Sequence, residues 1–134
     1  MAERTLLVPR LFLQHFTHGS RLVERDGEVL GFLIGFLSAS RRDEGYIHFI
    51  AVDPALRKQG LAQYLYEWFF DYCRAHGRST VRAVTSPGNA TSHAFHTAMG
   101  FRTEPGPASF EGRPVQRDYD GPGMDRVTFV RSIA

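Results

Sequence analysis

A glycine stands among basic residues where a helix is expected to begin, directly after an apolar strand. The segment runs Ile50-Ala-Val-Asp-Pro-Ala-Leu-Arg-Lys-Gln-Gly-Leu-Ala62. The first N–H groups of a helix have no partner within the helix and lie at the positive end of its dipole, so they bind anions. Gly60 lets a phosphate approach the backbone, and Arg57 and Lys58 add positive charge. The segment predicts a phosphate or pyrophosphate site. The alternative is that Gly60 is present only because the packing there requires a small residue.

Two histidines stand where they could act on a ligand bound there. His96 lies on a predicted helix that begins near Asn89, and His48 lies on the strand before the glycine segment. An imidazole with a pKa near 6.5 can give or take a proton around neutral pH. Each histidine could instead be structural, and Asn89 could simply cap its helix.

No metal site is predicted. Histidine and cysteine residues spaced three apart are His15 and His18, His93 and His96, and Cys73 and His76, but no third and fourth ligand stands at zinc-site spacing.

The apolar periodicity predicts the elements that position these residues. Strands are expected at Arg21–Glu24, Val29–Ser38, Tyr46–Val52, Thr80–Thr85 and Arg126–Ser132, and helices at Leu6–Phe16, Arg57–His76 and Asn89–Met99. Asp26-Gly27 between the first two strands predicts an antiparallel hairpin, and the strand, helix, strand order that follows predicts a right-handed parallel crossover. The fold class is therefore α/β, of the α+β kind: one domain over 1–134 with a mixed central sheet flanked by helices.

The two later helices each carry an apolar face that is expected to pack on the sheet. The long helix would bury Leu61, Tyr64, Leu65, Trp68, Phe69 and Tyr72, and the shorter one Ala94, Phe95, Ala98 and Met99. Cys73 lies deep in the long helix and is expected to be a buried small hydrophobe, not a nucleophile.

Composition limits the class of protein. With 43% hydrophobic and 22% charged residues among 134, the chain is expected to form one globular core. The formal charge is +2 and the basic residues are dispersed, so nucleic-acid binding is not predicted. The single cysteine fits a reducing compartment. Because we find neither a membrane-length apolar run nor a signal peptide over Met1–Arg10, we expect a cytoplasmic protein with no membrane partner.

Two motifs in this order resemble those of the GNAT N-acetyltransferase superfamily. Arg57–Ala62 is similar to its acetyl-CoA signature Arg/Gln-x-x-Gly-x-Gly/Ala. Asn89–Phe101 is similar to its pattern Asn … Tyr-x-x-x-Gly-Phe, with His96 in place of the tyrosine. The resemblance covers about Ser20–Phe101. It implies an enzyme that transfers an acetyl group from acetyl-CoA to a primary amine by direct attack in a ternary complex.

The resemblance also implies roles for particular residues of the cofactor site. Strand residues would bond the pantetheine amides through their backbone, the loop and helix start would wrap the pyrophosphate, and an asparagine would hold the cofactor arm. These residues are Ile50, Ala51 and Val52, then Arg57, Lys58, Gln59, Gly60, Leu61, Ala62 and Gln63, and Asn89.

Two steps of the implied reaction need a proton donor and a base. His96 would serve the departing thiolate, either as an imidazolium acid or as a neutral N–H that donates a hydrogen bond. The base that deprotonates the amine is expected among Glu44, Tyr46 and His48, with His48 preferred.

The acceptor is less constrained. Its contacts are expected from Ala39–Gly45 and Glu104–Asp125. Within the second segment, Asp118, Asp120 and Asp125 either attract a cationic amine or form solvated turns.

The assembly is the least constrained feature. Relatives carry more chain before the hairpin, so the N-terminus is expected to be short. The apolar segment Val127–Val130 predicts a closing strand at which two copies form a homodimer.

Two functions remain as alternatives to an enzyme. One is a CoA-binding sensor without turnover, and the other is a protein-interaction module.

Overall fold

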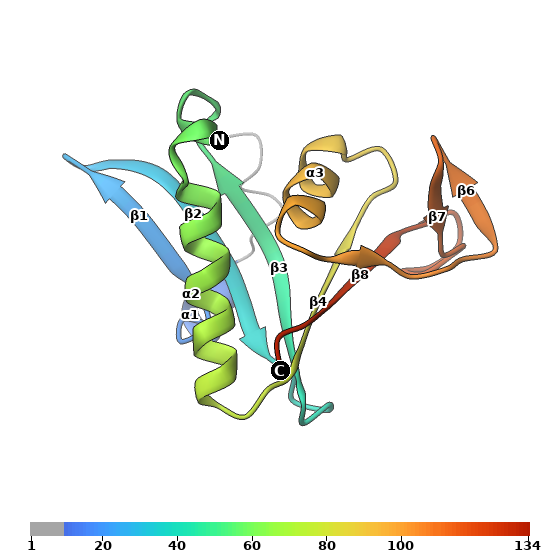
Figure 1. The fold of residues 1–134 in the computed structure, drawn as a ribbon, viewed down its shortest axis with the longest axis horizontal. Helices are drawn as coiled ribbons and strands as arrows, with labels where there is room; N and C mark the ends of the chain where they lie inside the picture. The colour runs from blue at the N-terminus through green and yellow to red at the C-terminus, as the bar shows by residue number, and fades with distance from the viewer. Residues whose placement is uncertain (1–9) are drawn as a thin grey trace.

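A six-stranded mixed sheet is the frame of the fold, with its strands in the order β1-β2-β3-β4-β8-β5 (Figure 1). The computed structural model describes residues 10–134, and at Arg57 and Lys58 the backbone alone. The strands of the sheet are β1 Arg21–Arg25, β2 Glu28–Leu37, β3 Glu44–Val52, β4 Thr80–Thr85, β5 Arg102–Thr103 and β8 Val127–Ser132. The helices are α1 Arg10–His15, the 3-10 helix η2 Pro54–Gln59, α2 Leu61–Ala75 and α3 Ala90–Ala98. The segment Met1–Pro9, with the start of the predicted first helix, lies outside the described residues.

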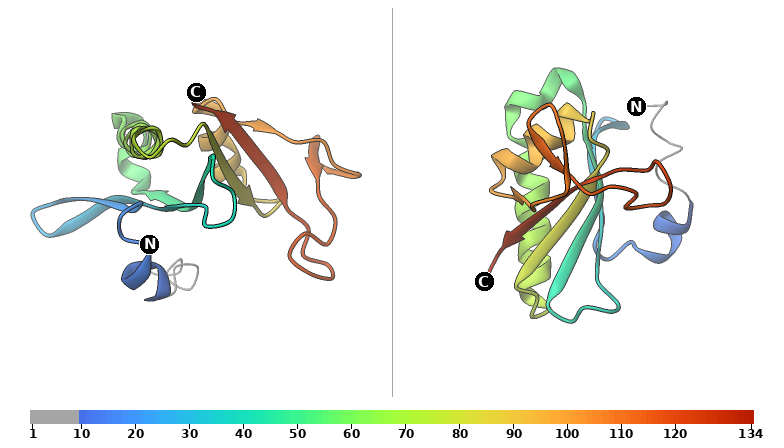
Figure 2. Two further views of the ribbon diagram at one scale, coloured as in Figure 1. Left: turned by 90° about the horizontal axis from the view of Figure 1, so that it is seen from below. Right: turned by 90° about the vertical axis from the view of Figure 1, so that its right-hand side faces the viewer.

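The predicted connections are confirmed. β1 and β2 form an antiparallel hairpin that turns at Asp26 and Gly27, whose φ angles of 52° and 82° are those of a type I′ turn. β3 and β4 pair in parallel, and α2 forms the crossover between them. α2 lies on one face of the sheet and α1 on the other (Figure 2). The sheet is therefore mixed, as the sequence predicts.

The long helix begins later than predicted. Pro54–Gln59 winds as a 3-10 helix, Gly60 adopts the left-handed conformation with φ 79° and ψ 8°, and α2 starts only at Leu61. Asp53 caps the 3-10 helix, its Oδ1 accepting from Ala55 N at 2.9 Å. A left-handed residue cannot continue a right-handed helix, so Gly60 separates two helices where the sequence predicts one.

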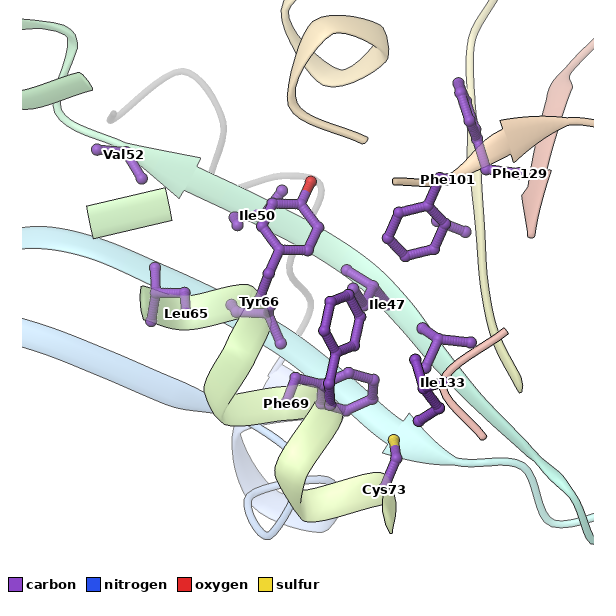
Figure 3. Packing of buried hydrophobic residues seen from close by; sticks show 14 of the residues in the cluster. Ile47, Ile50, Val52, Leu65, Tyr66, Phe69, Cys73, Phe101, Phe129 and Ile133 are labelled. Atoms are coloured by element: carbon purple, nitrogen blue, oxygen red, sulfur yellow. The ribbon is translucent and has the colours of Figure 1, made fainter. Parts of the chain in front are cut away.

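The face that α2 buries is turned from the predicted one. Its buried residues are Leu65, Tyr66, Phe69, Phe70 and Cys73, and Figure 3 shows several of them against β3. Leu65 and Phe69 were predicted correctly, but Tyr64 is 43% exposed. Apolar residues occupy most of the helix circumference, so periodicity alone could not select the side that meets the sheet. Cys73 is buried as predicted, and burial raises the pKa of its thiol to about 12.

The predicted core face of α3 is half right, because Phe95 and Met99 pack against the core but Ala94 and Ala98 do not. Ala94 and Ala98 are exposed, Phe95 and Met99 are half-buried, and His96 is the one buried residue of this helix. The side of α3 that carries His96 is the side that packs most closely on the rest of the protein. A polar residue therefore occupies a buried position where the sequence predicts an apolar one.

The tail after α3 contains strands that the sequence does not predict. β6 (Ala108–Phe110) and β7 (Arg113–Val115) form a separate hairpin that turns at Glu111-Gly112, both with positive φ. β5 pairs with the outer side of β8, so β8 is interior and Val127–Val130 is buried. The exposed apolar edge expected at this segment is therefore wrong.

We predict that Gly35→Ala destabilises the fold. A Cβ at Gly35 would lie 2.5 Å from Cε1 of Phe69, whose ring is fully buried and has no room to move. Overpacking of this kind costs about 1–3 kcal/mol, measurable as a lower urea midpoint. Gly88→Ala is the matched control, because its Cβ would meet nothing within 4 Å. Equal midpoints for the two variants would contradict the tight packing of α2 on β2.

Candidate active site

His48 is an extra residue in β3. In the ladder between β2 and β3, Gly35 pairs with Ile47 and Ile34 pairs with Phe49, so His48 has no partner position and forms a β-bulge. The parallel pairing with β4 ends at the same place, its last pair being Ile47 and Ala83.

Beyond this point the two strands diverge, as Figure 1 shows. The β3 backbone over 49–52 stays paired with β2 but is in no ladder with β4. Ile50, Ala51 and Val52, which the sequence assigns to the cofactor site, lie on this unpaired edge. Backbone groups of alternate residues face opposite neighbours, so those of this stretch that point away from β2 are available to a ligand.

A cavity of about 380 Å³ fills the opening between the diverging strands. It brings together four of the predicted site residues from β3, α3 and the turn before α3: His48, Ile50, Asn89 and His96. Ala51, Val52 and the loop at Gly60 do not line it. Asp120 and Arg126, from the tail, line its mouth as an ion pair with Nε to Oδ2 at 2.9 Å.

The predicted phosphate loop borders a second, open groove of about 680 Å³ between α2 and α3. Gly60, Ala62 and Gln63 line its α2 side. Gly60 offers no side-chain cap to the N–H groups of α2, and a Cβ at this position would meet nothing within 4 Å. The space above Gly60 is thus open to an anion, which fits a phosphate ligand.

The remaining loop residues are placed as follows. Gln59 is exposed, and Leu61 is half-buried against the core. Gln63 donates from Nε2 to Glu67 Oε1 at 3.2 Å. The side chains of Arg57 and Lys58 lie outside what the structure describes.

His96 is 3% exposed and forms one hydrogen bond, between Nδ1 and the hydroxyl of Tyr66 at 2.7 Å. The rings of Phe101 and Phe129 lie 5.3 and 4.9 Å from its own, centroid to centroid. Burial, with a smaller contribution from His93, lowers the pKa of His96 to about 4. The ring is therefore neutral at neutral pH, which disfavours the imidazolium acid and leaves the neutral N–H as the donor.

Asn89 caps α3, its Oδ1 accepting from Ser92 N at 3.0 Å. The capping role considered for it from the sequence is therefore correct. Because Asn89 also lines the cavity, a cofactor contact remains compatible with the cap.

Among the three candidate bases, His48 is placed best. Its ring is half-buried and stacks on Phe12 of α1 at 4.1 Å. Tyr46 also lines the cavity, but burial, followed by the charges of Tyr119 and Asp120, raises its pKa to about 12. Tyr46 is therefore protonated at neutral pH and is a poor base.

Glu44, the third candidate base, is outside the lining of the cavity. Its carboxylate accepts from Arg82 Nε at 2.9 Å, and Arg82 also donates to Glu104 at 3.0 Å. Arg82 and Glu104, with Tyr46 and Tyr119, line a further cavity of about 430 Å³. We call it the outer cavity. Tyr46 and Val84 line both cavities, so the two are neighbours.

The sequence offers two roles for the three aspartates of the tail, attraction of a cationic amine or formation of a turn, and the structure places them differently. Asp118 Oδ1 accepts from Gly123 N and Asp125 Oδ1 accepts from Asp118 N, so both shape a turn. Asp120 alone lines the cavity.

Sequence reasoning missed Tyr66 and Arg126 as site residues. A tyrosine on an apolar helix face needs a partner for its hydroxyl when buried, and this signal could have pointed to Tyr66. Arg126 carries no such signal, because its role depends on how the tail folds back.

Within residues 10–134, no group of three histidine, cysteine, aspartate or glutamate side chains could hold a metal ion. No helix in the same range is long and apolar enough to cross a membrane.

Comparison with known proteins gives one consistent result. The profile of the acetyltransferase (GNAT) family matches residues 3–101. An L-2,4-diaminobutyric acid acetyltransferase of Nocardia farcinica is 29% identical over 92 residues, which cover 69% of this chain and 48% of that protein. The chain spans about half the length of the curated relatives it matches.

Solved structures share the fold. A GNAT-family protein from Desulfovibrio desulfuricans superposes with a TM-score of 0.71 at 20% identity, over 86% of this chain and 69% of that one. The structure of yncA from Salmonella typhimurium, solved with its cofactor acetyl-CoA, superposes with a TM-score of 0.63 at 19% identity, over 99% of this chain and 69% of that one.

We predict that burial of His96 makes folding stability fall on acidification. The unfolded chain takes up this proton near the ordinary pKa of 6.5, whereas the folded chain does so only near 4. The free energy of unfolding therefore falls as pH drops through this window, by about 3 kcal/mol from this residue.

The control for this prediction is His96→Gln, whose amide can still accept from Tyr66 but does not titrate. Urea unfolding at pH 7, 5 and 4 should show a steeper loss of stability for the wild type than for the variant. Parallel curves would mean that His96 is not held neutral in the folded state.

Proposed function

The chain belongs to the acetyltransferase (GNAT) family, and from this premise we propose that it transfers an acetyl group from acetyl-CoA to a primary amine. The observation that carries the proposal is the divergence of β3 from β4 at the His48 bulge, which opens a cavity onto unpaired backbone groups, Asn89 and His96. The acetyltransferase named among its relatives supports the same reaction.

The donor site follows from two features of the backbone. The unpaired edge of Ile50, Ala51 and Val52 would bond the pantetheine amides, and the uncapped N–H groups after Gly60 would hold the pyrophosphate, with Arg57, Lys58, Gln59, Leu61, Ala62 and Gln63 around it. Asn89 would contact the cofactor arm from the α3 side. When bound, acetyl-CoA supplies an activated acetyl group as a thioester.

The acceptor must arrive as a free amine. An ammonium with a pKa of about 10.4 costs about 5 kcal/mol to deprotonate at neutral pH. His48 lies at the bulge beside the cavity and is the base we propose. The amine nitrogen then bonds to the acetyl carbon, the carbon–sulfur bond breaks, and the proton lost by nitrogen balances the one gained by the thiolate.

We propose that the acceptor is a small molecule that carries both an amine and a carboxylate. The outer cavity presents a cation, Arg82, and an anion, Glu104, and the mouth of the neighbouring cavity presents Arg126 and Asp120. In the structure each of these cations is paired with its anion, and a zwitterion would bind by offering its carboxylate to the arginine and its ammonium to the carboxylate of such a pair. The relative that acts on diaminobutyric acid, which has both groups, supports this class.

Homodimerisation stays a prediction without an assigned surface, because the strand that motivated it, β8, is interior. A cytoplasmic location also stays a prediction.

We predict that Gly60→Val abolishes binding of acetyl-CoA. A valine side chain would fill the open space that a phosphate needs, and it would strain a left-handed residue. Gly77→Val controls for the strain, because Gly77 also has positive φ and open space but lies at the other end of α2. Calorimetry should show binding to the Gly77 variant and none to the Gly60 variant. Equal affinity of the two folded variants would place the phosphate elsewhere.

We predict that CoA is released from acetyl-CoA in the presence of 2,4-diaminobutyrate. A thiol reagent should report release at least tenfold faster than with 1,3-diaminopropane, which has the amines but no carboxylate to pair with Arg82 or Arg126. Equal rates with the two amines would exclude recognition of the carboxylate. Binding of acetyl-CoA without release by any amine would favour the sensor that is the alternative to an enzyme.

A further inference from the structure

Tyr66 is buried, and among the described residues its hydroxyl has one hydrogen-bond partner. Its side chain is 0% exposed, on the α2 face that packs on the sheet. Figure 3 shows the hydroxyl pointing away from α2 toward α3. Its hydrogen-bond partner among residues 10–134 is His96 Nδ1, at 2.7 Å. Burial also raises the pKa of this hydroxyl above its ordinary value, so it keeps its proton.

The direction of this hydrogen bond follows from counting donors. A buried O–H that donates to nothing costs about 1–3 kcal/mol. If His96 carried its proton on Nδ1 and donated to Tyr66, the hydroxyl proton would have no acceptor among the described residues. Tyr66 therefore donates and Nδ1 accepts, which leaves the ring proton on Nε2.

We propose that Tyr66 is a positioning residue: its hydroxyl holds His96 as the neutral tautomer that carries its proton on Nε2, and directs that N–H toward the cavity lined by His96. No other described group forms a hydrogen bond with the His96 ring, so Nε2–H is available to a ligand. A donor fixed in this way is preorganised, because neither the ring angle nor the tautomer has to change when charge develops on a ligand.

The consequence rests on the acetyl transfer proposed above. Nε2–H would stabilise the negative charge that grows on sulfur as the carbon–sulfur bond breaks, and it would keep its own proton throughout. The proton that the thiolate finally gains comes from the amine nitrogen, directly or through water. His96 is then a hydrogen-bond donor and neither a general acid nor a base.

The groups around His96 are consistent with a neutral ring. His93 on α3 disfavours a second positive charge nearby, and Tyr66 on α2 is uncharged. Across the cavity, His48 and Tyr46 come from β3, and Asp120 and Arg126 from the tail compensate each other as an ion pair. Between pH 6 and 9 the rate should therefore rise with deprotonation of the acceptor amine, without a falling limb from His96.

The tautomer can be observed directly by 15N NMR of histidine-labelled protein at pH 7. The protein has six histidines, and the signals missing from His96→Gln identify those of His96. We expect a protonated Nε2 and an unprotonated Nδ1 in the wild type. In Tyr66→Phe, which removes only the hydroxyl, we expect protonation to redistribute between the two nitrogens. A wild-type ring protonated on Nδ1 overturns the proposal without the need for any variant.

Kinetics separate positioning from general structure. Tyr66→Phe should lower kcat about tenfold with little change in the KM for acetyl-CoA, less than the roughly hundredfold loss expected when a preorganised donor is removed outright, as in His96→Leu. His96→Gln should retain most of the activity that His96→Leu loses, because the glutamine amide can accept from Tyr66 and donate into the cavity. Tyr72→Phe is the control on the same helix and should behave as the wild type.

The outcomes distinguish this proposal from the function on which it rests. If Tyr66→Phe keeps the wild-type tautomer and a kcat within about twofold of Tyr72→Phe, Tyr66 has no positioning role. If the wild type neither binds acetyl-CoA by calorimetry nor releases CoA, the proposed function fails, while the NMR experiment still decides the tautomer.

Discussion

The site depends on one extra residue in β3. A bulge at His48 shifts the alternation of side chains by one, so Ile47 before it and Ile50 after it both point into the core under α2. Without the extra residue one of the two would face the other side of the sheet. The same bulge marks the end of pairing with β4, so core packing is preserved while one edge of β3 is released.

A released edge is costly unless another group satisfies it, which is why the opening is surrounded by polar elements. α3 brings Asn89 and His96 to the gap, and the tail brings Asp120 and Arg126. Tyr66 and His96 form a buried polar pair beside the apolar core beneath. A net hydrogen bond contributes only about 1 kcal/mol, but loss of either partner leaves the other buried and unsatisfied. The pair therefore behaves as a unit, whatever ligand occupies the cavity.

Sequence reasoning worked where one local signal sufficed. Alternating apolar residues gave the main strands, and Asp26-Gly27 gave the hairpin because few turns accept two residues with positive φ. It failed where the local sequence fits two arrangements equally well. α2 is apolar around most of its circumference, and only contact with the sheet selects Tyr66 over Tyr64 for burial. The interior position of β8 depends on β5, a strand too short to leave a pattern. The cofactor site was predicted through resemblance and stays a proposal, whereas the hydrogen bond between Tyr66 and His96 could be found only from the fold.

The donor half and the acceptor half of the proposed site are built from different parts of the chain. The donor half consists largely of main chain, namely the unpaired edge of β3 and the helix start after Gly60, and such groups persist through most side-chain substitutions. The acceptor half consists of side chains from segments far apart in sequence: Phe12 from α1 stacks on His48, and Asp120 and Arg126 come from the tail. With Arg82 of β4, these side chains would decide which acceptor binds, without any change in the main chain of the donor half. The bulge at His48 lies between the two proposed halves. It would therefore hold His48 in the same place relative to the donor, whichever acceptor binds.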